Sequence, residues 1–165
     1  MIGYVILALV AAQRLAELVY AQHNTKMLLA RGGTEIGRRH YPILVALHAA
    51  WLIAIVLALP QPAGLYWAPL AGYIALQGLR VWTVASLGRY WTTRIITLPG
   101  APLVRRGPYR FVRHPNYLIV TGEIALLPLV FGEVWVAVLF TILNAIALCW
   151  RIREEETALT PRRLL

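Results

Sequence analysis

The sequence is short of charge and of cysteine. Charged residues make up only 14% of the 165 residues, whereas soluble domains average about 25%. Cys149 is the single cysteine, which excludes an internal disulfide, and no spacing of cysteine and histidine suits a metal site. Hydrophobic residues make up 59%, and the mean hydropathy is +0.64. These features argue against a soluble or disulfide-stabilised domain and indicate one small membrane domain.

Long apolar runs dominate the chain, and the two-residue alternation that is typical of barrel strands is lacking. Backbone groups in lipid must be paired, so these runs are expected to form helices. Five runs cover residues 2–22, 43–60, 66–87, 117–132 and 134–150. The sequence therefore predicts an all-α integral membrane protein, with residues 1–165 as one domain of about five transmembrane helices. Only Gly132-Glu133 separates the last two, which predicts a tight helical hairpin.

Positively charged residues are concentrated in three of the segments outside the apolar runs and are scarce elsewhere. All 16 Lys and Arg except Arg14 and Arg80 lie in residues 23–42, 88–116 and 151–165. Five spans place these three segments on one side of the membrane, which the positive-inside rule assigns to the cytoplasm. We therefore expect an outside N-terminus and a cytoplasmic C-terminus in a bacterial inner (plasma) membrane. The net charge of +9 then indicates membrane lipids as partners and does not require nucleic acid.

A few polar residues interrupt the apolar segments. Arg14 and Glu17 are three residues apart, so they can share a helix face, and we expect a structural pair. Gln77 and Arg80 have the same spacing. Arg80 is expected either to snorkel to the cytoplasmic interface or to hold an anionic ligand through its guanidinium. Ionisable residues within spans usually face the bundle interior or a wet cavity.

An acidic run closes the last apolar segment. On a helix, Arg151, Glu154 and Glu155 fall on one face, whereas Glu156 is expected to point away and be solvated. Negative charge is unfavourable at a helix C-terminus, so the run indicates a cationic partner unless the helix continues. The alternative is a charged helix end in water.

The segment 88–116 is basic and interrupted by prolines and glycines, which predicts a loop. Pro115 restricts His114 to an extended conformation and suits the first turn of the next helix. His114, Asn116 and Tyr117 are therefore expected at a helix N-terminus, where backbone N–H groups favour an anion. Taken one by one, these residues also fit an interfacial histidine and an aromatic belt.

Two motifs together resemble one family. The block Gly107-Pro108-Tyr109-Arg110 with Arg113-His114-Pro115-x-Tyr117, and the terminal Arg-x-x-Glu-Glu, are similar to the isoprenylcysteine carboxyl methyltransferase family. Residues 87–95 and the segment His40-Tyr41-Pro42 resemble a bacterial branch of this family, whose members are assigned as alkylpyrone or alkylresorcinol O-methyltransferases. The resemblance implies S-adenosyl-L-methionine as cofactor, bound at the cytosolic face, with S-adenosyl-L-homocysteine as product. By match, the implied cofactor residues are His114, Tyr117, Glu154 and Glu155, with Gly107, Tyr109 and Arg113 beside them.

The resemblance also implies a lipophilic or lipidated acceptor that enters from the bilayer. We expect methylation of a carboxylate, phenol or enol oxygen, with Arg151 or, as second candidate, Arg80 holding the acceptor. Relatives usually carry a longer cytosolic tail, so a lid over the cofactor is expected either to be missing or to be built from residues 23–42. The alternatives are a phospholipid amine N-methyltransferase and a non-enzymatic small membrane protein. The sequence leaves the acceptor, the use of a general base and the oligomeric state open.

Overall fold

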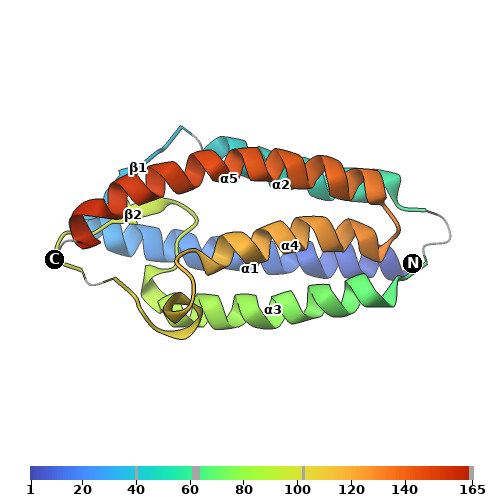
Figure 1. Ribbon diagram of the computed structural model, residues 1–165, viewed down its shortest axis with the longest axis horizontal. Coiled ribbons are helices and arrows are strands. Elements are labelled where there is room, and N and C mark those ends of the chain that lie inside the picture. Colours follow the sequence, from blue (N-terminus) through green and yellow to red (C-terminus); the bar gives the residue numbers. More distant parts are fainter. Residues whose placement is uncertain (40, 61–63, 102, 164–165) are drawn as a thin grey trace.

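Five helices lie side by side along one axis in the computed structural model, which describes residues 1–39, 41–60, 64–101 and 103–163 (Figure 1). They are α1 (Ile2–Ala30), α2 (Tyr41–Ala58), α3 (Trp67–Leu87), α4 (Pro115–Val130) and α5 (Val134–Arg163). The N-terminus lies at one end of the bundle, whereas the long loop and the C-terminus lie at the other, which we call the loop end. The prediction of a mostly helical chain is confirmed.

The tight hairpin of the last two helices is also confirmed. α4 ends at Val130 and α5 begins at Val134, and the two helices pack against each other. Gly132 has φ 81°, a conformation that L side chains rarely adopt, so a glycine is needed for this short turn. α4 also packs against α3. The hairpin thereby brings the first turn of α4 beside the second half of α5.

Within the described residues, three helices are long and apolar enough to cross a membrane by length and composition, namely Ile2–Ala30, Tyr41–Ala58 and Val134–Ala158. Pro115–Val130 is a shorter apolar helix. Every one of the five helices exposes large apolar side chains, among them Leu15, Ile53, Ile74, Leu118 and Ile142. Such an outward-facing apolar surface is typical of helices that contact lipid. Five spans and their orientation stay predictions.

The first and last helices are longer than the apolar segments predicted. α1 has 29 residues and α5 has 30, or about 45 Å at 1.5 Å per residue. A hydrocarbon layer is about 30 Å thick, which is less than the length of either helix. Glu154, Glu155 and Glu156 consequently lie within α5 and not at its C-terminus. The helix continues past these residues to Arg163, which is the case in which the dipole argument for a cationic partner does not apply.

The hydrophobic core contains residues of all five helices. Trp51 and Ile55 of α2 are buried against Ile124 and Leu127 of α4 and Phe140 of α5. The indole N–H of Trp51 donates to the carbonyl of Ile124 at 3.2 Å. Lipid tails are as apolar as these side chains, so close packing and interhelical hydrogen bonds stabilise such an interface.

A cluster of polar side chains joins α1, α3 and α4 inside the bundle. The predicted pair is confirmed, because Arg14 Nη1 lies 3.1 Å from Glu17 Oε2. Arg80 is only 4% exposed, so the expectation that it snorkels to the interface is wrong. Its guanidinium instead donates to Glu123 of α4 and Glu17 of α1. Gln77 joins the same cluster through a 2.7 Å hydrogen bond to Glu123.

Two short strands correct the prediction of an all-α chain. β1 (Thr34–Ile36) pairs antiparallel with β2 (Ile95–Thr97), with Thr34 opposite Thr97. Strands of three residues are too short to give a recognisable alternation. Glu35 of β1 also forms an ion pair with Arg94, the residue before β2, at 2.8 Å. In the described part of residues 23–42, β1 is joined to the long loop through β2, and a role of this segment as a lid stays a prediction.

Candidate active site

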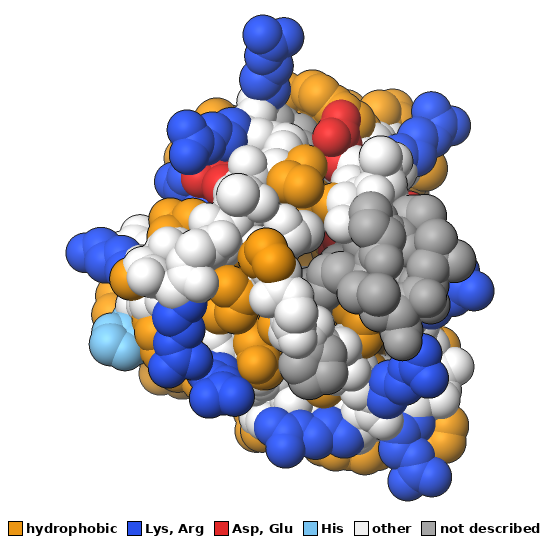
Figure 2. Space-filling view, turned by 90° about the vertical axis from the view of Figure 1, so that its left-hand side faces the viewer, with side chains coloured by type: hydrophobic (Ala, Val, Ile, Leu, Met, Phe, Trp, Pro, Cys, Tyr) orange, Lys and Arg blue, Asp and Glu red, His pale blue; other side chains and the backbone are white. Residues whose placement is uncertain are grey.

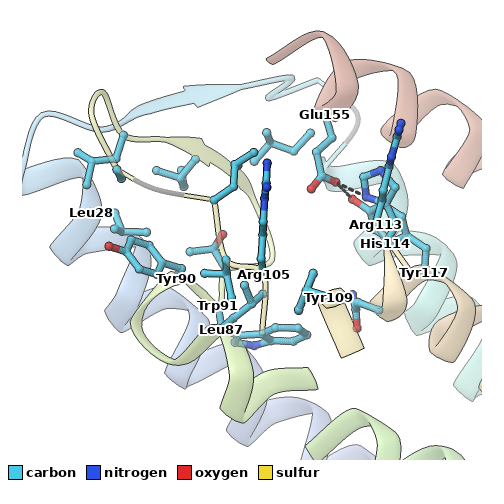
Figure 3. Close-up of a pocket in the computed structure, with 18 of the residues that line it drawn as sticks. Leu28, Leu87, Tyr90, Trp91, Arg105, Tyr109, Arg113, His114, Tyr117 and Glu155 are labelled. Atoms are coloured by element: carbon cyan, nitrogen blue, oxygen red, sulfur yellow. Dashed lines mark hydrogen bonds and ion pairs between the residues drawn. The ribbon is translucent and has the colours of Figure 1, made fainter. Parts of the chain in front are cut away.

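A cavity of about 420 Å³ lies at the loop end of the bundle (Figure 3). Small-molecule sites usually measure about 300–1,000 Å³. One wall is largely apolar and includes Leu28, Leu87, Ile95, Leu103 and Val104. The facing wall carries polar and charged side chains, namely Tyr109, Arg113, His114, Asn116, Tyr117, Arg151 and Glu155. We call these the apolar wall and the polar wall.

The polar wall begins where the long loop enters α4. Pro115 occupies the first turn of α4, and His114 is its N-cap residue, with no side-chain cap hydrogen bond. The helix then places Tyr117 beside His114, and their rings stack with centroids 5.2 Å apart and planes 18° apart. The predicted helix start at Pro115 is confirmed, and it fixes the direction in which both rings face the cavity.

α5 supplies the second half of the polar wall. Arg151 Nε donates to the hydroxyl of Tyr117 at 2.9 Å, and this hydroxyl donates to the carboxylate of Glu155. Arg151 and Glu155 are four residues apart, so they lie on one face of α5. Arg151 Nη2 also donates to the carbonyl of Thr93 at 2.9 Å. This arginine therefore connects the loop, α4 and α5 around one edge of the cavity.

The sequence predicted that Glu154 lies beside Glu155 at the site. The structure differs, because Glu156 is the second glutamate there. Glu156 was expected to be solvated, but its carboxylate accepts a hydrogen bond of 2.7 Å from His114 Nε2. Glu154 does not line the cavity among the described residues, and it accepts instead from Trp150 Nε1 at 3.3 Å. The helical period fixes the angles between the three glutamate side chains, but it does not say which of them meets another element. The position of His114 decides that Glu156, and not Glu154, is the one contacted.

Two other predicted site residues lie away from the cavity. Gly107 has φ 58°, and a Cβ atom there would lie 1.9 Å from Ser86 Oγ. This glycine is required for the approach of the loop to α3, and it does not line the cavity. Arg80 is enclosed by the carboxylates of Glu17 and Glu123. Its guanidinium is therefore not available to hold an acceptor in this cavity.

Tyr109 brings a protonated phenol to the polar wall. Burial raises the pKa of this phenol above its usual value, and the negative charge of Glu155 raises the pKa further. A neutral phenol donates a hydrogen bond and does not act as a base near pH 7. Tyr109 is thus suited to bind a ligand oxygen or nitrogen and unsuited to remove a proton.

Two polar atoms of the cavity are buried without a hydrogen-bond partner in the described part of the chain. They are Nε1 of Trp91 and Oδ1 of Asn116. Trp91 is only 4% exposed, so its side chain lies in the interior. Trp91 belongs to residues 87–95, one of the segments that carry the resemblance seen in the sequence, but no role was assigned to its indole. Asn116 was signalled by its place after Pro115.

The surface around the loop end is strongly basic. Figure 2 faces this end and shows Lys and Arg side chains spread over it, with few acidic ones between them. Arg105 and Arg113 bring part of this charge to the cavity itself. Among the described charged residues that line the cavity, Glu155 is the one carboxylate facing Arg105, Arg113 and Arg151. The cavity is therefore favourable for anionic groups, except near Glu155.

The comparisons with known proteins agree with one family. A family model described as the isoprenylcysteine carboxyl methyltransferase family matches residues 67–161, which include α3, the loop, α4 and most of α5. The uncharacterized protein YpbQ of Bacillus subtilis is 38% identical over 160 residues, covering 94% of this chain and 95% of that protein.

An uncharacterized protein of Haemophilus influenzae is 25% identical over 158 residues, covering 93% of this chain and 92% of that protein. No solved structure matches the chain. The matched region is more than half of the chain and contains most of the cavity walls. The chain belongs to the isoprenylcysteine carboxyl methyltransferase family.

Proposed function

We propose that this protein is an S-adenosylmethionine-dependent methyltransferase that acts on an oxygen of a lipophilic acceptor at the cytoplasmic face of the membrane. The observation that carries the proposal is the two-sided cavity at the basic loop end. Its polar wall suits a charged cofactor, and its apolar wall suits an acceptor from the bilayer. Membership of the isoprenylcysteine carboxyl methyltransferase family supports the same reaction.

The residues of the polar wall fit the cofactor's chemistry. Glu155 offers a carboxylate to a cationic group, and the unpartnered Asn116 Oδ1 offers an acceptor to an ammonium or amine N–H. The first turn of α4 offers its dipole to a carboxylate. His114 and Tyr117 form a stacked aromatic surface beside these groups. We propose these residues, with Tyr109 and Arg113, as the cofactor site.

S-adenosylmethionine supplies a methyl group on a sulfonium: the acceptor's O–C bond forms as the C–S bond breaks with its electron pair going to sulfur, which leaves S-adenosylhomocysteine. The protein's share of this chemistry is positioning, which contributes about 7–11 kcal/mol in favourable cases. A carboxylate acceptor needs no base, whereas a phenol or enol must lose its proton. His114, which contacts Glu156 at 2.7 Å, is the residue of the polar wall suited to accept it.

Arg151 acts as a positioning residue in this proposal. Its bonds to the hydroxyl of Tyr117 and to the carbonyl of Thr93 hold the polar wall against the loop. A planar guanidinium makes both bonds at once, in different directions. The acceptor's alkyl chain would lie along Leu87, Leu103 and the rest of the apolar wall, and reach the bilayer from there.

An amine acceptor is the second candidate and is less favoured by the charges of the cavity. An alkylamine is an ammonium ion at neutral pH, and Arg105, Arg113 and Arg151 would repel it. An acidic oxygen would be attracted by the same three side chains. A non-enzymatic membrane protein would have no need of this cavity, and cofactor binding distinguishes it from both enzymes.

Purified protein incubated with radiolabelled S-adenosylmethionine and total membrane lipid tests the proposal. We expect radioactivity to move into the organic phase with the wild type and with Glu133→Gln, which changes the turn at the opposite end. We expect no transfer with Glu155→Gln. Base-labile label in the product would indicate a methyl ester, and base-stable label an ether or amine. Failure of wild-type protein to bind S-adenosylhomocysteine in calorimetry would exclude the proposed function.

A further inference from the structure

The indole N–H of Trp91 is a hydrogen-bond donor with no acceptor in the part of the chain that the structure describes. The side chain is 4% exposed and lines the cavity, and Nε1 has no partner among the described residues. Figure 3 shows it among the cavity residues, near Leu87 and below Arg105. Buried N–H groups are nearly always paired in folded proteins, because an unpaired one is costly. An unpaired donor in a ligand-sized cavity indicates that a ligand supplies the acceptor.

The backbone on both sides of Trp91 is held firmly. Asn24 of α1, which is 2% exposed, donates to the carbonyl of Trp91 at 2.9 Å and to that of Gly88 at 3.1 Å. The backbone N–H of Trp91 donates to the carbonyl of Gly88 at 2.9 Å. Two residues later, Arg151 holds the carbonyl of Thr93. These bonds fix the backbone position from which the Trp91 side chain enters the cavity.

The surroundings of Trp91 identify which ligand reaches it. Leu87 and Ile95, its near neighbours in sequence, belong to the apolar wall, and Leu28 of α1 lies on the same wall. The hydrogen-bonding groups suited to the cofactor lie on the facing wall, at Asn116 and Glu155. A ligand group beside Trp91 is thus the polar end of a molecule whose apolar part lies on the apolar wall.

We propose that the indole N–H of Trp91 binds the oxygen head of the acceptor and selects oxygen acceptors over amines. This inference rests on the proposed methyltransferase function and adds the residue that determines acceptor class. An N–H group donates to a carboxylate, phenolate or enolate oxygen, and has nothing to offer an ammonium group, which is a donor itself. Arg105, which lines the cavity as well, favours the same anionic oxygen.

A spectroscopic test observes the N–H directly. Protein labelled with ¹⁵N at its six tryptophan indoles gives one N–H signal for each, and Trp91→Phe assigns the signal of Trp91. Palmitate and 3-pentadecylphenol serve as oxygen probes and hexadecylamine as the amine probe, each with S-adenosylhomocysteine present. We expect the Trp91 proton signal to move downfield with an oxygen probe and to stay in place with the amine.

A kinetic test separates acceptor binding from cofactor binding. Trp91→Phe keeps an aromatic ring in the cavity but removes the donor. With the oxygen probe that accepts methyl groups, we expect KM to rise about tenfold, the effect of losing one hydrogen bond to a charged group. The affinity for S-adenosylhomocysteine should stay within twofold. Trp135→Phe, an 86% exposed position at the far end, is the matched control and should leave both quantities unchanged.

The outcomes are distinguishable. Movement of the Trp91 signal with S-adenosylhomocysteine alone would assign Trp91 to the cofactor and overturn the inference. No movement with either oxygen probe at saturating concentration, or equal movement with hexadecylamine, would also overturn it. Each of these results leaves the proposed function intact, provided that the cofactor binds. Absence of cofactor binding would instead contradict the proposed function.

Discussion

Arg80 and Glu123 form a two-point ion pair between α3 and α4 inside the helix bundle. Arg80 Nε donates to Glu123 Oε1 at 2.8 Å, and Nη2 donates to the other carboxylate oxygen. Arg14 Nη2 lies 2.8 Å from the same Oε1, and Arg80 Nη1 lies 3.0 Å from Glu17. Two arginines and two glutamates thus balance one another among three helices. Such a closed arrangement fixes the relative height of α1, α3 and α4.

Replacing Glu123 should destabilise the bundle severely. Glu123→Gln keeps the size of the side chain but leaves Arg80 and Arg14 without their shared carboxylate. Breaking a buried pair on one side costs about 3–5 kcal/mol, so we expect a markedly lower melting temperature in detergent. The double variant Glu123→Leu with Arg80→Met should lose less than the sum of its single changes. Additive losses would contradict a coupled pair.

Glu155 and Glu154 should differ in their effects on the cofactor. Glu155→Gln removes the carboxylate that faces the cavity, and we expect at least a tenfold weaker binding of S-adenosylhomocysteine. Glu154 contacts Trp150 outside the cavity, so Glu154→Gln should change this affinity by less than threefold. Calorimetric titration of both variants measures the difference. Equal losses would indicate a general electrostatic effect of the acidic run.

Most of the helical arrangement follows from the sequence, because long apolar runs leave the backbone few alternatives in lipid. Gly132-Glu133 is too short to separate two helices widely, so the hairpin follows as well. The side-chain cluster was only partly predictable. Arg14 and Glu17 reveal themselves by spacing, whereas Glu123 is a lone carboxylate within an apolar segment. Its need for a cationic partner was a usable signal that pointed to Arg80.

The details of the site depend on tertiary contacts that the sequence does not encode locally. The helical period groups Arg151 with Glu155, but the place of His114 against α5 decides that Glu156 and not Glu154 is its neighbour. The burial of Trp91 likewise depends on Asn24, which lies 67 residues earlier in the chain. No helical period or local motif predicts contacts between residues so far apart in the sequence.

Replacing Arg151 by lysine should loosen the loop as well as slow turnover. Lysine keeps the positive charge but cannot donate to Tyr117 and to the Thr93 carbonyl with the same planar group. We expect turnover to fall at least tenfold and hydrogen exchange of residues 92–98 to become faster. Exchange mass spectrometry reports the second effect independently of any acceptor. Unchanged exchange would show that Arg151 does not fasten the loop to α5.

The phenol of Tyr109 should make stability depend on pH in alkaline solution. Its pKa is raised in the folded protein above the ordinary value of about 10. The unfolded chain therefore loses this proton first, so the contribution is complete below pH 10 and is lost as the pH rises beyond it. The Tyr109→Phe variant has no phenol at this position, so it lacks this contribution to the pH dependence of stability. Between pH 8 and 11, the wild type should lose more unfolding free energy than the variant, and parallel losses would contradict the shift.

The orientation of the chain is testable because both ends of the bundle offer an open position. Gly64 precedes α3 at the end opposite the cavity, and a Cβ atom there meets nothing within 4 Å. Thr157 is exposed on α5 near the loop end. Cysteine at either position, in a Cys149→Ser background because Cys149 is itself exposed, gives a single site for an impermeant maleimide. These substitutions leave the cavity walls unchanged.

We expect intact cells to label the cysteine at position 64 and to label the one at position 157 only after permeabilisation. The reason is electrostatic: the basic segments 23–42, 88–116 and 151–165 all belong to the loop end, and such segments stay on the cytoplasmic side. This orientation exposes the cavity to the cytoplasm, where a water-soluble cofactor is present. Labelling in the reverse order would invert the protein in the membrane and would turn the cavity away from the cofactor, which contradicts the proposed function.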